Sequence, residues 1–357
     1  MNRPLLAARA GSALAALPVA LVLGLAALRA GEAQPPSTLE RTIVGGSGGW
    51  DYLTMDGARH RLFITRGDRV QRFDTATMRV IAEIPGTDGV HGVALAPDLH
   101  IGFTSDGRSN SVTLFELDSL RRTARIDHVG DGPDAIVYDK SSGQGFTFNG
   151  RSRNATAIDL RAARVVATIA LPGRPEFAVT DEAGSLFVNI EDRNTIARID
   201  VASLSVTAQW PLPGCEVPTG LAIDASKRRL FASCGNRTLM VVDADSGAIV
   251  ARLPIGAGSD AVLFDAAKSL VLWSNREGTL SILREDDADH YVAEPGAATR
   301  PGARTLALDP LAQRVHLVTA DFAAWSSSAP ASGTPRPVPI PGTFSVLTLD
   351  LAGYPDR

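Results

Sequence analysis

The alternation of apolar and polar residues recurs along the chain at a nearly constant interval. Short alternating runs, such as Leu221-Ala222-Ile223-Asp224, end in an acidic or turn residue every 40 to 44 residues. These end positions are Asp56, Ala96, Asp139, Asp181, Asp224, Asp265 and Asp309. A second series of acidic residues runs in phase with the first and consists of Asp74, Asp118, Asp159, Asp200, Asp243, Glu285 and Asp350. An insertion widens the last gap of this series. A period of this length, present seven times, is typical of β-propeller blades.

A single repeat shows the content of one blade. Residues 219–223, 229–233, 238–242 and 248–253 read as four strands, and turn-forming residues separate them. No stretch of the chain carries a helical period. One blade cannot cover both of its faces, so neighbouring blades must stack around an axis. We therefore predict an all-β fold, a seven-bladed β-propeller with four antiparallel strands per blade.

The two ends of the repeat region predict how the ring closes. Beyond Asp350 only seven residues remain, which is too few for a good outer strand. The stretch Glu40-Arg41-Thr42-Ile43-Val44-Gly45 resembles an outer strand and precedes the first inner strand. We expect this N-terminal strand to complete the last blade, which leaves no open sheet edge there.

The repeats resemble the YVTN-type β-propeller family, also called YncE-like proteins. The stretches that carry the resemblance are Gly89-Val90-His91-Gly92-Val93-Ala94-Leu95-Ala96-Pro97-Asp98, Pro218-Thr219-Gly220-Leu221-Ala222-Ile223-Asp224 and Val241-Val242-Asp243-Ala244-Asp245-Ser246-Gly247. The resemblance covers nearly all of the chain after its N-terminal segment and implies a seven-bladed propeller of the bacterial cell envelope. The naming tetrapeptide of the family is degenerate in the first blade, where Phe63-Ile64-Thr65-Arg66 stands in its place.

The N-terminal segment predicts export. Residues 1–33 begin with positive charge, continue with the uncharged run 11–28 and end in small residues suited to cleavage after Ala33. We expect a signal peptide at 1–33, a short linker at 34–39, a propeller at 40–357 and a periplasmic location. The apolar run is at the lower limit for a membrane span and contains Pro18, so an uncleaved membrane anchor is the alternative.

Charge limits the possible partners. The formal net charge is −4 and becomes −6 without residues 1–33. A protein with this charge lacks the positive field that nucleic acid requires. We expect no nucleic-acid partner, no membrane span after signal cleavage and a monomer. A small polar ligand or a protein remains as the expected partner.

Polar residues stand where each inner strand begins, five positions before its end. In a propeller these positions line one mouth of the central channel. They are Asp51, His91, Asp134, Glu176, Thr219, Asp260 and Arg304. Glu216 precedes the fifth inner strand, and Asn149 and Asn275 end second strands, so we expect these three at the same mouth. Glu191 and Asp192 stand on the same rim, where solvated loop carboxylates are the alternative to a wider acidic site.

The ring of polar residues has two interpretations. Crowded carboxylates raise one another's pKa unless a cation or an arginine intervenes. The ring can therefore bind a divalent cation or a small polar ligand that bridges its acidic and basic sides. The alternative is that these groups cap strand ends and order water. The sequence predicts no cofactor, with a divalent cation as the possible exception, and no dedicated metal motif.

Two further features concern covalent and flexible structure. Cys215 and Cys234 flank one hairpin of an exported chain, so we predict a disulfide that closes a loop of about 20 residues. Residues 323–341 are rich in Pro, Ser and Ala and interrupt the last blade on the mouth side. They predict either a lid or partner-binding arm, with Trp325 as an anchor, or an uninvolved loop.

Motifs of known catalytic chemistry are missing. Gly45-Gly46-Ser47-Gly48-Gly49 matches Gly-x-Ser-x-Gly, but a nucleophile elbow needs a strand, a turn and a helix, and this segment joins two strands. We therefore expect a binding or scaffold protein rather than an enzyme. The alternative is a metal-dependent, lactonase-like hydrolase with Asp134, Glu176, Asp260 and Asn275 as ligands and His91 as base. A non-covalent haem protein is a third hypothesis, which the few aromatic and Met residues do not favour.

Overall fold

The computed structural model describes Met1, residues 39–323 and residues 337–354. Apart from Met1 and Leu39, the expected signal peptide and linker lie outside the described residues. So do residues 324–336 of the expected insertion at 323–341, Trp325 included. No helix among the described residues is long and apolar enough to cross a membrane.

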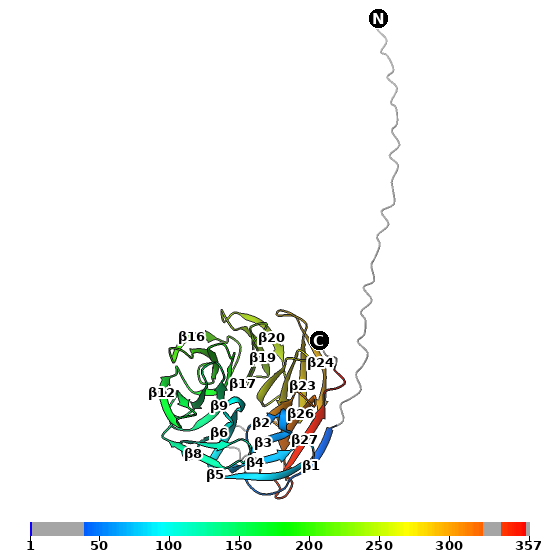
Figure 1. Cartoon of the computed structure of the whole chain (residues 1–357). Helices are drawn as coiled ribbons and strands as arrows, with labels where there is room; N and C mark the ends of the chain where they lie inside the picture. The colour runs from blue at the N-terminus through cyan, green and yellow to red at the C-terminus, as the bar shows by residue number, and fades with distance from the viewer. Residues whose placement is uncertain (2–38, 324–336, 355–357) are drawn as a thin grey trace. The chain divides into compact units, whose positions relative to one another are not determined.

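The structure is all-β and consists of seven blades of four antiparallel strands (Figure 1). The inner strands are β2 (Leu53–Asp56), residues 92–96 of β5 (Arg79–Ala96), β9 (Pro133–Asp139), β13 (Pro175–Thr180), β17 (Pro218–Asp224), β21 (Ser259–Asp265) and β25 (Leu306–Asp309). The second strands are β3 (Arg61–Thr65), β6 (Ile101–Asp106), β10 (Gln144–Asn149), β14 (Ser185–Ile190), β18 (Arg229–Cys234), β22 (Leu270–Asn275) and β26 (Arg314–Thr319).

The outer half of each blade follows the same order. The third strands are β4 (Gly67–Asp74), β7 (Ser111–Glu116), β11 (Asn154–Asp159), β15 (Thr195–Asp200), β19 (Thr238–Asp243), β23 (Thr279–Glu285) and β27 (Ser345–Asp350). The outermost strands are residues 79–85 of β5, β8 (Arg122–Asp127), β12 (Arg164–Ala170), β16 (Ser205–Pro211), β20 (Ile249–Pro254), β24 (Tyr291–Ala298) and β1 (Leu39–Ile43). Two 3₁₀ turns, η1 (Gly57–Arg59) and η2 (Pro97–Leu99), follow the first two inner strands. Because β5 continues from the first blade into the second, these two blades share one seven-stranded sheet.

The core lies between the blades. The inner strands contact one another in a closed cycle that returns from β25 to β2. Each of the seven buried apolar clusters is built by two neighbouring blades. In the cluster between the first and second blades, for example, Phe63 and Ile84 pack against Val93 and Phe115. This packing buries the face that a single blade cannot cover itself, which explains why the repeats fold as one ring.

The predicted closure is confirmed. Strand β1 pairs with β27 along five residues, from Leu39 with Leu349 to Ile43 with Ser345. Figure 1 shows the blue β1 beside the red β27. Arg41 strengthens this pairing, since its guanidinium donates to Ser345 Oγ at 2.8 Å and pairs with Asp321 Oδ2 at 3.0 Å. The last blade is therefore assembled from both ends of the repeat region.

The predicted disulfide is also present. Cys215 and Cys234 are bonded, with their Cα atoms 5.4 Å apart. Both residues are buried, at 3% and 2% exposure, in the cluster between the fourth and fifth blades. The bond ties the loop before β17 to the end of β18.

Candidate functional site

The polar residues expected around the channel mouth lie at local irregularities of the inner strands. In five blades the register of the inner strand against the second strand shifts at or beside that position. In β13, for example, Glu176 and Phe177 together face one residue of β14, because Pro175 pairs with Ile190 and Ala178 with Val188. A bulge of this kind re-aims side chains. Consecutive residues can therefore both face the channel.

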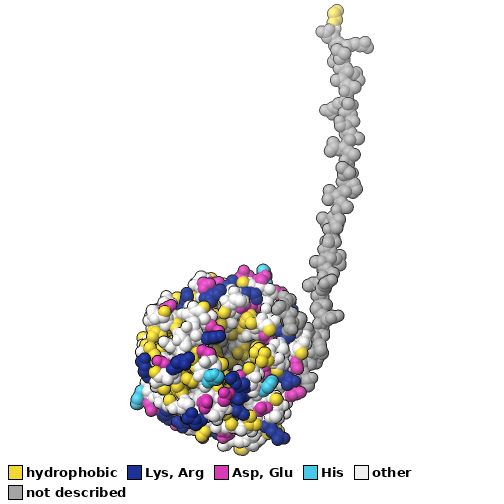
Figure 2. Space-filling model, in the orientation of Figure 1, with side chains coloured by type: hydrophobic (Ala, Val, Ile, Leu, Met, Phe, Trp, Pro, Cys, Tyr) yellow, Lys and Arg dark blue, Asp and Glu magenta, His cyan; other side chains and the backbone are white. Residues whose placement is uncertain are grey.

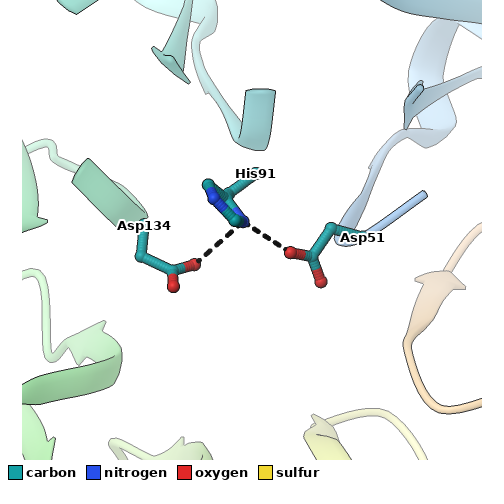
Figure 3. Close-up of side chains that lie close together, drawn as sticks. All are labelled: Asp51, His91 and Asp134. Atoms are coloured by element: carbon teal, nitrogen blue, oxygen red, sulfur yellow. Dashed lines mark hydrogen bonds and ion pairs between the residues drawn. The ribbon is translucent and has the colours of Figure 1, made fainter. Parts of the chain in front are cut away.

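Three blades contribute the centre of the site. His91 lies between two carboxylates, with its Nδ1 atom 2.7 Å from Asp51 Oδ2 and 3.6 Å from Asp134 Oδ1. Figure 3 shows both carboxylates pointing at the ring from opposite sides. One ligand atom from each of the three residues lies within 4.8 Å of those of the other two. The His91 side chain is 38% exposed, so a solute in the mouth can reach it.

Arg304 links the first and sixth blades across the last one. Its guanidinium pairs with Asp51 Oδ1 at 3.2 Å and with Asp260. The negative charges of Asp260 and Asp51 raise the pKa of Arg304 despite its burial. Asp51 thus holds both His91 and Arg304, and Asp260 holds Arg304. The carboxylates of Asp134 and Glu176 are not paired with this arginine.

Asp134 and Glu176 have acidic neighbours but too few cationic partners, and their pKa values are raised. Burial, together with the charges of Asp134 and Asp260, raises the pKa of Glu176 to about 9. Burial raises the pKa of Asp134 to about 6, where the charges of Asp51 and Asp260 add to it and His91 opposes it. Burial alone would lower the pKa of His91, but the hydrogen bond that its Nδ1–H donates to Asp51 and the charge of Asp134 outweigh burial and raise that pKa. The mouth therefore holds protons near neutral pH because its carboxyl groups are buried and outnumber their cationic partners.

The acidic group extends to one side through Glu191. Burial and the charge of Asp192 raise the pKa of Glu191, and Arg174, whose Nε atom lies 2.7 Å from Glu191 Oε1, opposes this shift. Asp192 accepts a hydrogen bond from the Arg174 backbone N–H at 2.8 Å. Glu191 is thus coupled electrostatically to Glu176, whereas Asp192 is held by the Arg174 N–H and by an ion pair with Arg153 at 3.2 Å.

An aromatic pair lies directly behind the charged ring, and sequence reasoning missed it. Tyr52 and Phe177 come from the first and fourth blades and meet edge to face, with ring centroids 5.1 Å apart. The other residues in this layer are small or short: Gly92, Ala135, Gly220, Ala261 and Thr305. Burial and the charges of Asp134, Glu176, Asp260 and Asp51 raise the pKa of Tyr52. The phenol is therefore neutral. The one sign of this pair in the sequence is that two of the seven residues that directly follow the ring positions are aromatic.

The channel beyond this pair is mainly apolar, although Asp56, Asp98, Lys140 and Glu182 also line it. A cavity of about 910 Å³ is lined by inner-strand side chains, among them Leu53, Val93, Ile136, Val179 and Leu263. Tyr52 and Phe177 also line it. In Figure 2, the face in view is hollowed at its centre, hydrophobic side chains lie inside the hollow, and charged side chains surround it. The channel therefore has a charged end and an apolar part, which the aromatic pair separates.

Four expected site residues do not join the charged group. Asn149 is buried inside its blade, where its Nδ2 donates to Val129 O at 2.9 Å and to Thr156 Oγ1 at 3.0 Å. Asn275 Nδ2 likewise donates to Thr279 and Ser281 at 2.9 and 2.8 Å. Both asparagines close the hairpin between the second and third strands instead of facing the mouth. Thr219 Oγ1 donates to Ser259 O at 2.8 Å, and within the described residues no hydrogen bond or ion pair joins the exposed Glu216 side chain to the ring.

The hydrolase alternative named Asn275 as a metal ligand. Because the side chain of Asn275 lies inside its blade, the set of Asp134, Glu176, Asp260 and Asn275 does not converge on one point. The group that does converge is Asp51, His91 and Asp134. One imidazole nitrogen and two carboxylates form a mixed set that transition-metal ions accept more readily than Ca²⁺, which prefers oxygen alone.

Comparison with known proteins bears on the fold alone. No protein-family model matches the chain, and no curated protein matches it either. Among solved structures, hydrazine synthase from Kuenenia stuttgartiensis is similar with a TM-score of 0.68 and 16% sequence identity. The match covers 77% of this chain and 94% of that one. The chain is thus a β-propeller made of four-stranded antiparallel sheets, similar in structure to a chain of that protein.

Proposed function

We propose that this protein is a non-catalytic, YVTN-type binding propeller that takes a divalent cation at the charged mouth of its channel. The observation that carries the proposal is the position of His91 between Asp51 and Asp134, with the ligand atoms of all three within 4.8 Å. A cation at this point would replace the protons that the site now holds. A small cationic ligand is the other occupant that the same charges would favour.

The electrostatics of the ring supports a cation over an anion. Glu176 and Asp134 have raised pKa values, and Arg304 already has two carboxylate partners. A divalent ion would relieve the repulsion among the acidic groups and let Asp134 ionise fully. Because ligands must lose their protons to bind a metal, affinity should rise with pH. We expect the affinity to fall as the pH decreases through about 6, where Asp134 gains its proton.

The test is isothermal titration calorimetry of the full propeller with Mn²⁺, Zn²⁺, Ca²⁺ and Mg²⁺ after treatment with a chelator. We expect binding at pH 7.5 with release of about one proton, measured from the heat in two buffers of different ionisation enthalpy. Asp134→Asn should weaken the affinity by about tenfold or more, which corresponds to at least ~1.4 kcal/mol. Glu216→Gln is the matched control, since it also removes one carboxylate but from an exposed loop.

Two results would contradict the cation site. One is equal loss of affinity in Asp134→Asn and Glu216→Gln, which indicates general charge attraction. The other is the absence of binding for all four ions together with an unchanged melting temperature. A protein or small polar partner at the mouth would then take the place of the cation in the proposal.

We further propose that the protein is exported to the periplasm. The sequence of residues 1–33 supports this, and a disulfide is expected in an oxidising compartment. N-terminal sequencing of the protein from a bacterial periplasmic extract should begin at Gln34. A full-length chain in the membrane fraction would instead support the uncleaved anchor.

A further inference from the structure

The mainly apolar part of the channel forms a cavity of its own, with a volume of about 910 Å³. This volume lies within the ~300–1,000 Å³ that is usual for ligand pockets. Of the described residues that line the cavity, none belongs to the charged ring of Asp51, His91, Asp134, Glu176, Asp260 and Arg304. Residues at the other ends of the inner strands do line it, namely Asp56, Gly57, Pro97, Asp98, Lys140 and Glu182. The cavity therefore runs from Tyr52 and Phe177 toward the mouth opposite the charged ring.

The walls of this cavity are aliphatic and remain accessible. Met55, Leu95, Val179, Ile223 and Leu263 come from five different inner strands and are each only half-buried. Each packs on one side against an apolar cluster between two blades. The remaining surface of each side chain lies in the channel. An apolar ligand would remove this surface from water, which is favourable.

The hydroxyl groups along the walls are engaged within the protein. Thr54 Oγ1 donates to Val93 O at 2.6 Å, and Thr180 Oγ1 donates to Asp139 Oδ1 at 2.7 Å. Nearer the open end, the Tyr138 hydroxyl donates to Asp98 Oδ2 at 2.9 Å. A polar group placed between these walls would lose its water without gaining these hydroxyls as donors, which is costly. The buried part of a ligand is therefore expected to be hydrocarbon.

The open end of the cavity carries charge. Asp98, Lys140 and Glu182 are exposed and come from the second, third and fourth blades. Asp56 also lines the cavity, but it pairs with Arg59 at 3.3 Å. Two exposed carboxylates thus stand beside one ammonium group, so this rim has an excess of negative charge. Complementary charge would place a cationic end of the ligand there.

We propose that this channel binds a long-chain aliphatic amine in its ammonium form. The chain lies along the aliphatic walls and ends near Tyr52 and Phe177, and the ammonium group stays at the rim beside Asp98 and Glu182. Four residue steps, from Tyr52 to Asp56, span about 13 Å at ~3.3 Å each, which suits a chain of roughly ten carbon atoms. The site lies on the other side of the aromatic pair from the cation site and does not depend on it.

The experiment compares three ligands with the same chain on the intact propeller. Decylamine, decanol and decanoate differ in the charge of one end, and each is titrated by calorimetry below the concentration at which it aggregates. We expect saturable binding that is tightest for decylamine and weakest for decanoate, and a raised melting temperature with decylamine. Among shorter amines, each methylene removed should weaken binding about three- to fourfold, because less apolar surface is covered.

A variant of the wall tests where the chain lies. Val179→Trp places a large ring in the channel and should weaken decylamine binding at least tenfold. Val166→Trp is the matched control, since Val166 is 39% exposed on the outermost strand β12, and it should change the affinity by no more than about twofold. If Val179→Trp does not fold, Leu263→Phe replaces it, with an expected loss of several-fold.

Variants of the rim test the charge of the bound end. Asp98→Asn should weaken decylamine binding about two- to fivefold, and Lys140→Met should strengthen it by a similar factor, as for exposed charge pairs. The two variants should have the opposite effects on decanoate. Asp127→Asn is the matched control, because Asp127 is also exposed and has one close partner, Arg125 at 2.7 Å, but lies on β8.

The same measurements can overturn the proposal. Tightest binding of decanoate would exclude a cationic ligand, and equal affinities for short and long amines would show that the chain is not bound in the channel. Equal affinities in Val179→Trp and Val166→Trp would exclude the walls as the site. Asp134→Asn, which disrupts the cation site, should bind decylamine within about twofold of the wild type. Loss of binding in that variant would place the ammonium group at the charged ring instead.

Discussion

At the scale of single residues, the protonation of Glu176 is linked to the fold. Burial and the neighbouring Asp134 and Asp260 raise its pKa from 4.5 to about 9 in the folded protein. The unfolded chain releases this proton near pH 4.5, while the folded protein keeps it up to about pH 9. In this range the folded state binds more protons than the unfolded state, so stability decreases as pH rises.

This linkage predicts the behaviour of Glu176→Gln. Glutamine is neutral at all pH values, so the variant should lose part of the pH dependence and be more stable than the wild type at pH 8. Between pH 5 and pH 8, we expect the free energy of unfolding of the wild type to fall by about 1–3 kcal/mol more than that of the variant. One unit of pKa corresponds to ~1.4 kcal/mol, and relaxation of the site reduces the effect. Urea unfolding at pH 5, 6.5 and 8 measures it. Glu182→Gln, at an exposed turn, serves as the control, and a wild-type slope in Glu176→Gln would contradict the assignment.

At the scale of secondary-structure elements, the repeat in the sequence predicts strands but not their bulges. Alternation and turn residues locate all four strands of a blade, because apolar and polar positions must match the two faces of a sheet. Strict alternation, however, sends neighbours such as Glu176 and Phe177 to opposite faces. The register shift between β13 and β14 turns both toward the channel. The charged ring could thus be predicted from position, whereas the aromatic pair behind it could not.

The second strands show a related difference. Asn149 and Asn275 end their strands on the mouth side, as the sequence indicates, yet their side chains turn into the hairpin. A strand end fixes where the backbone lies, but hydrogen-bond partners on the third strand decide where a short amide points. Arg66, at the matching position after β3, instead donates to Ser47 O at 3.0 Å.

The disulfide of the fifth blade allows a prediction at the same scale. Replacing both Cys215 and Cys234 with serine should lower the free energy of unfolding by about 3 kcal/mol, because the bond closes a loop whose ends are 19 residues apart. Guanidinium unfolding of the variant and the oxidised wild type measures the difference. Since both cysteines are buried, the folded wild type should resist reduction until it is partly unfolded. Full reduction of the wild type is checked by thiol titration. If the fully reduced protein were as stable as the oxidised one, this role of the disulfide would be contradicted.

At the scale of the whole molecule, closure of the ring depends on β1. Strand β1 is joined to the last blade by its five residue pairs with β27 and by the bonds of Arg41 to Ser345 and Asp321. Without β1, one edge of β27 is left unpaired, and an exposed edge promotes association between chains. The ring then also loses one of the links between its first and last blades, while the contact of β25 with β2 and the apolar cluster between these blades remain.

A truncation tests this closure. A chain that starts at residue 44 should melt about 5–10 °C below one that starts at residue 34, since each of five lost pairs contributes about 1 kcal/mol. It should also form oligomers in light scattering. Adding a peptide of residues 34–46 should restore the melting temperature, and a peptide with the same residues in shuffled order is the control. Equal melting of the two chains would show that β1 is dispensable.

The direction of the β1–β27 pairing has a mechanical consequence. Leu39, the first residue of β1, is paired with Leu349, next to the end of β27. Pulling on the two ends of the propeller chain would therefore load the β1–β27 ladder in the unzipping geometry, in which the residue pairs break one after another. The five pairs would not be sheared together. Under tension along its ends the ring would part first between these two strands, at low force, while the blades from the second to the sixth still hold their shape.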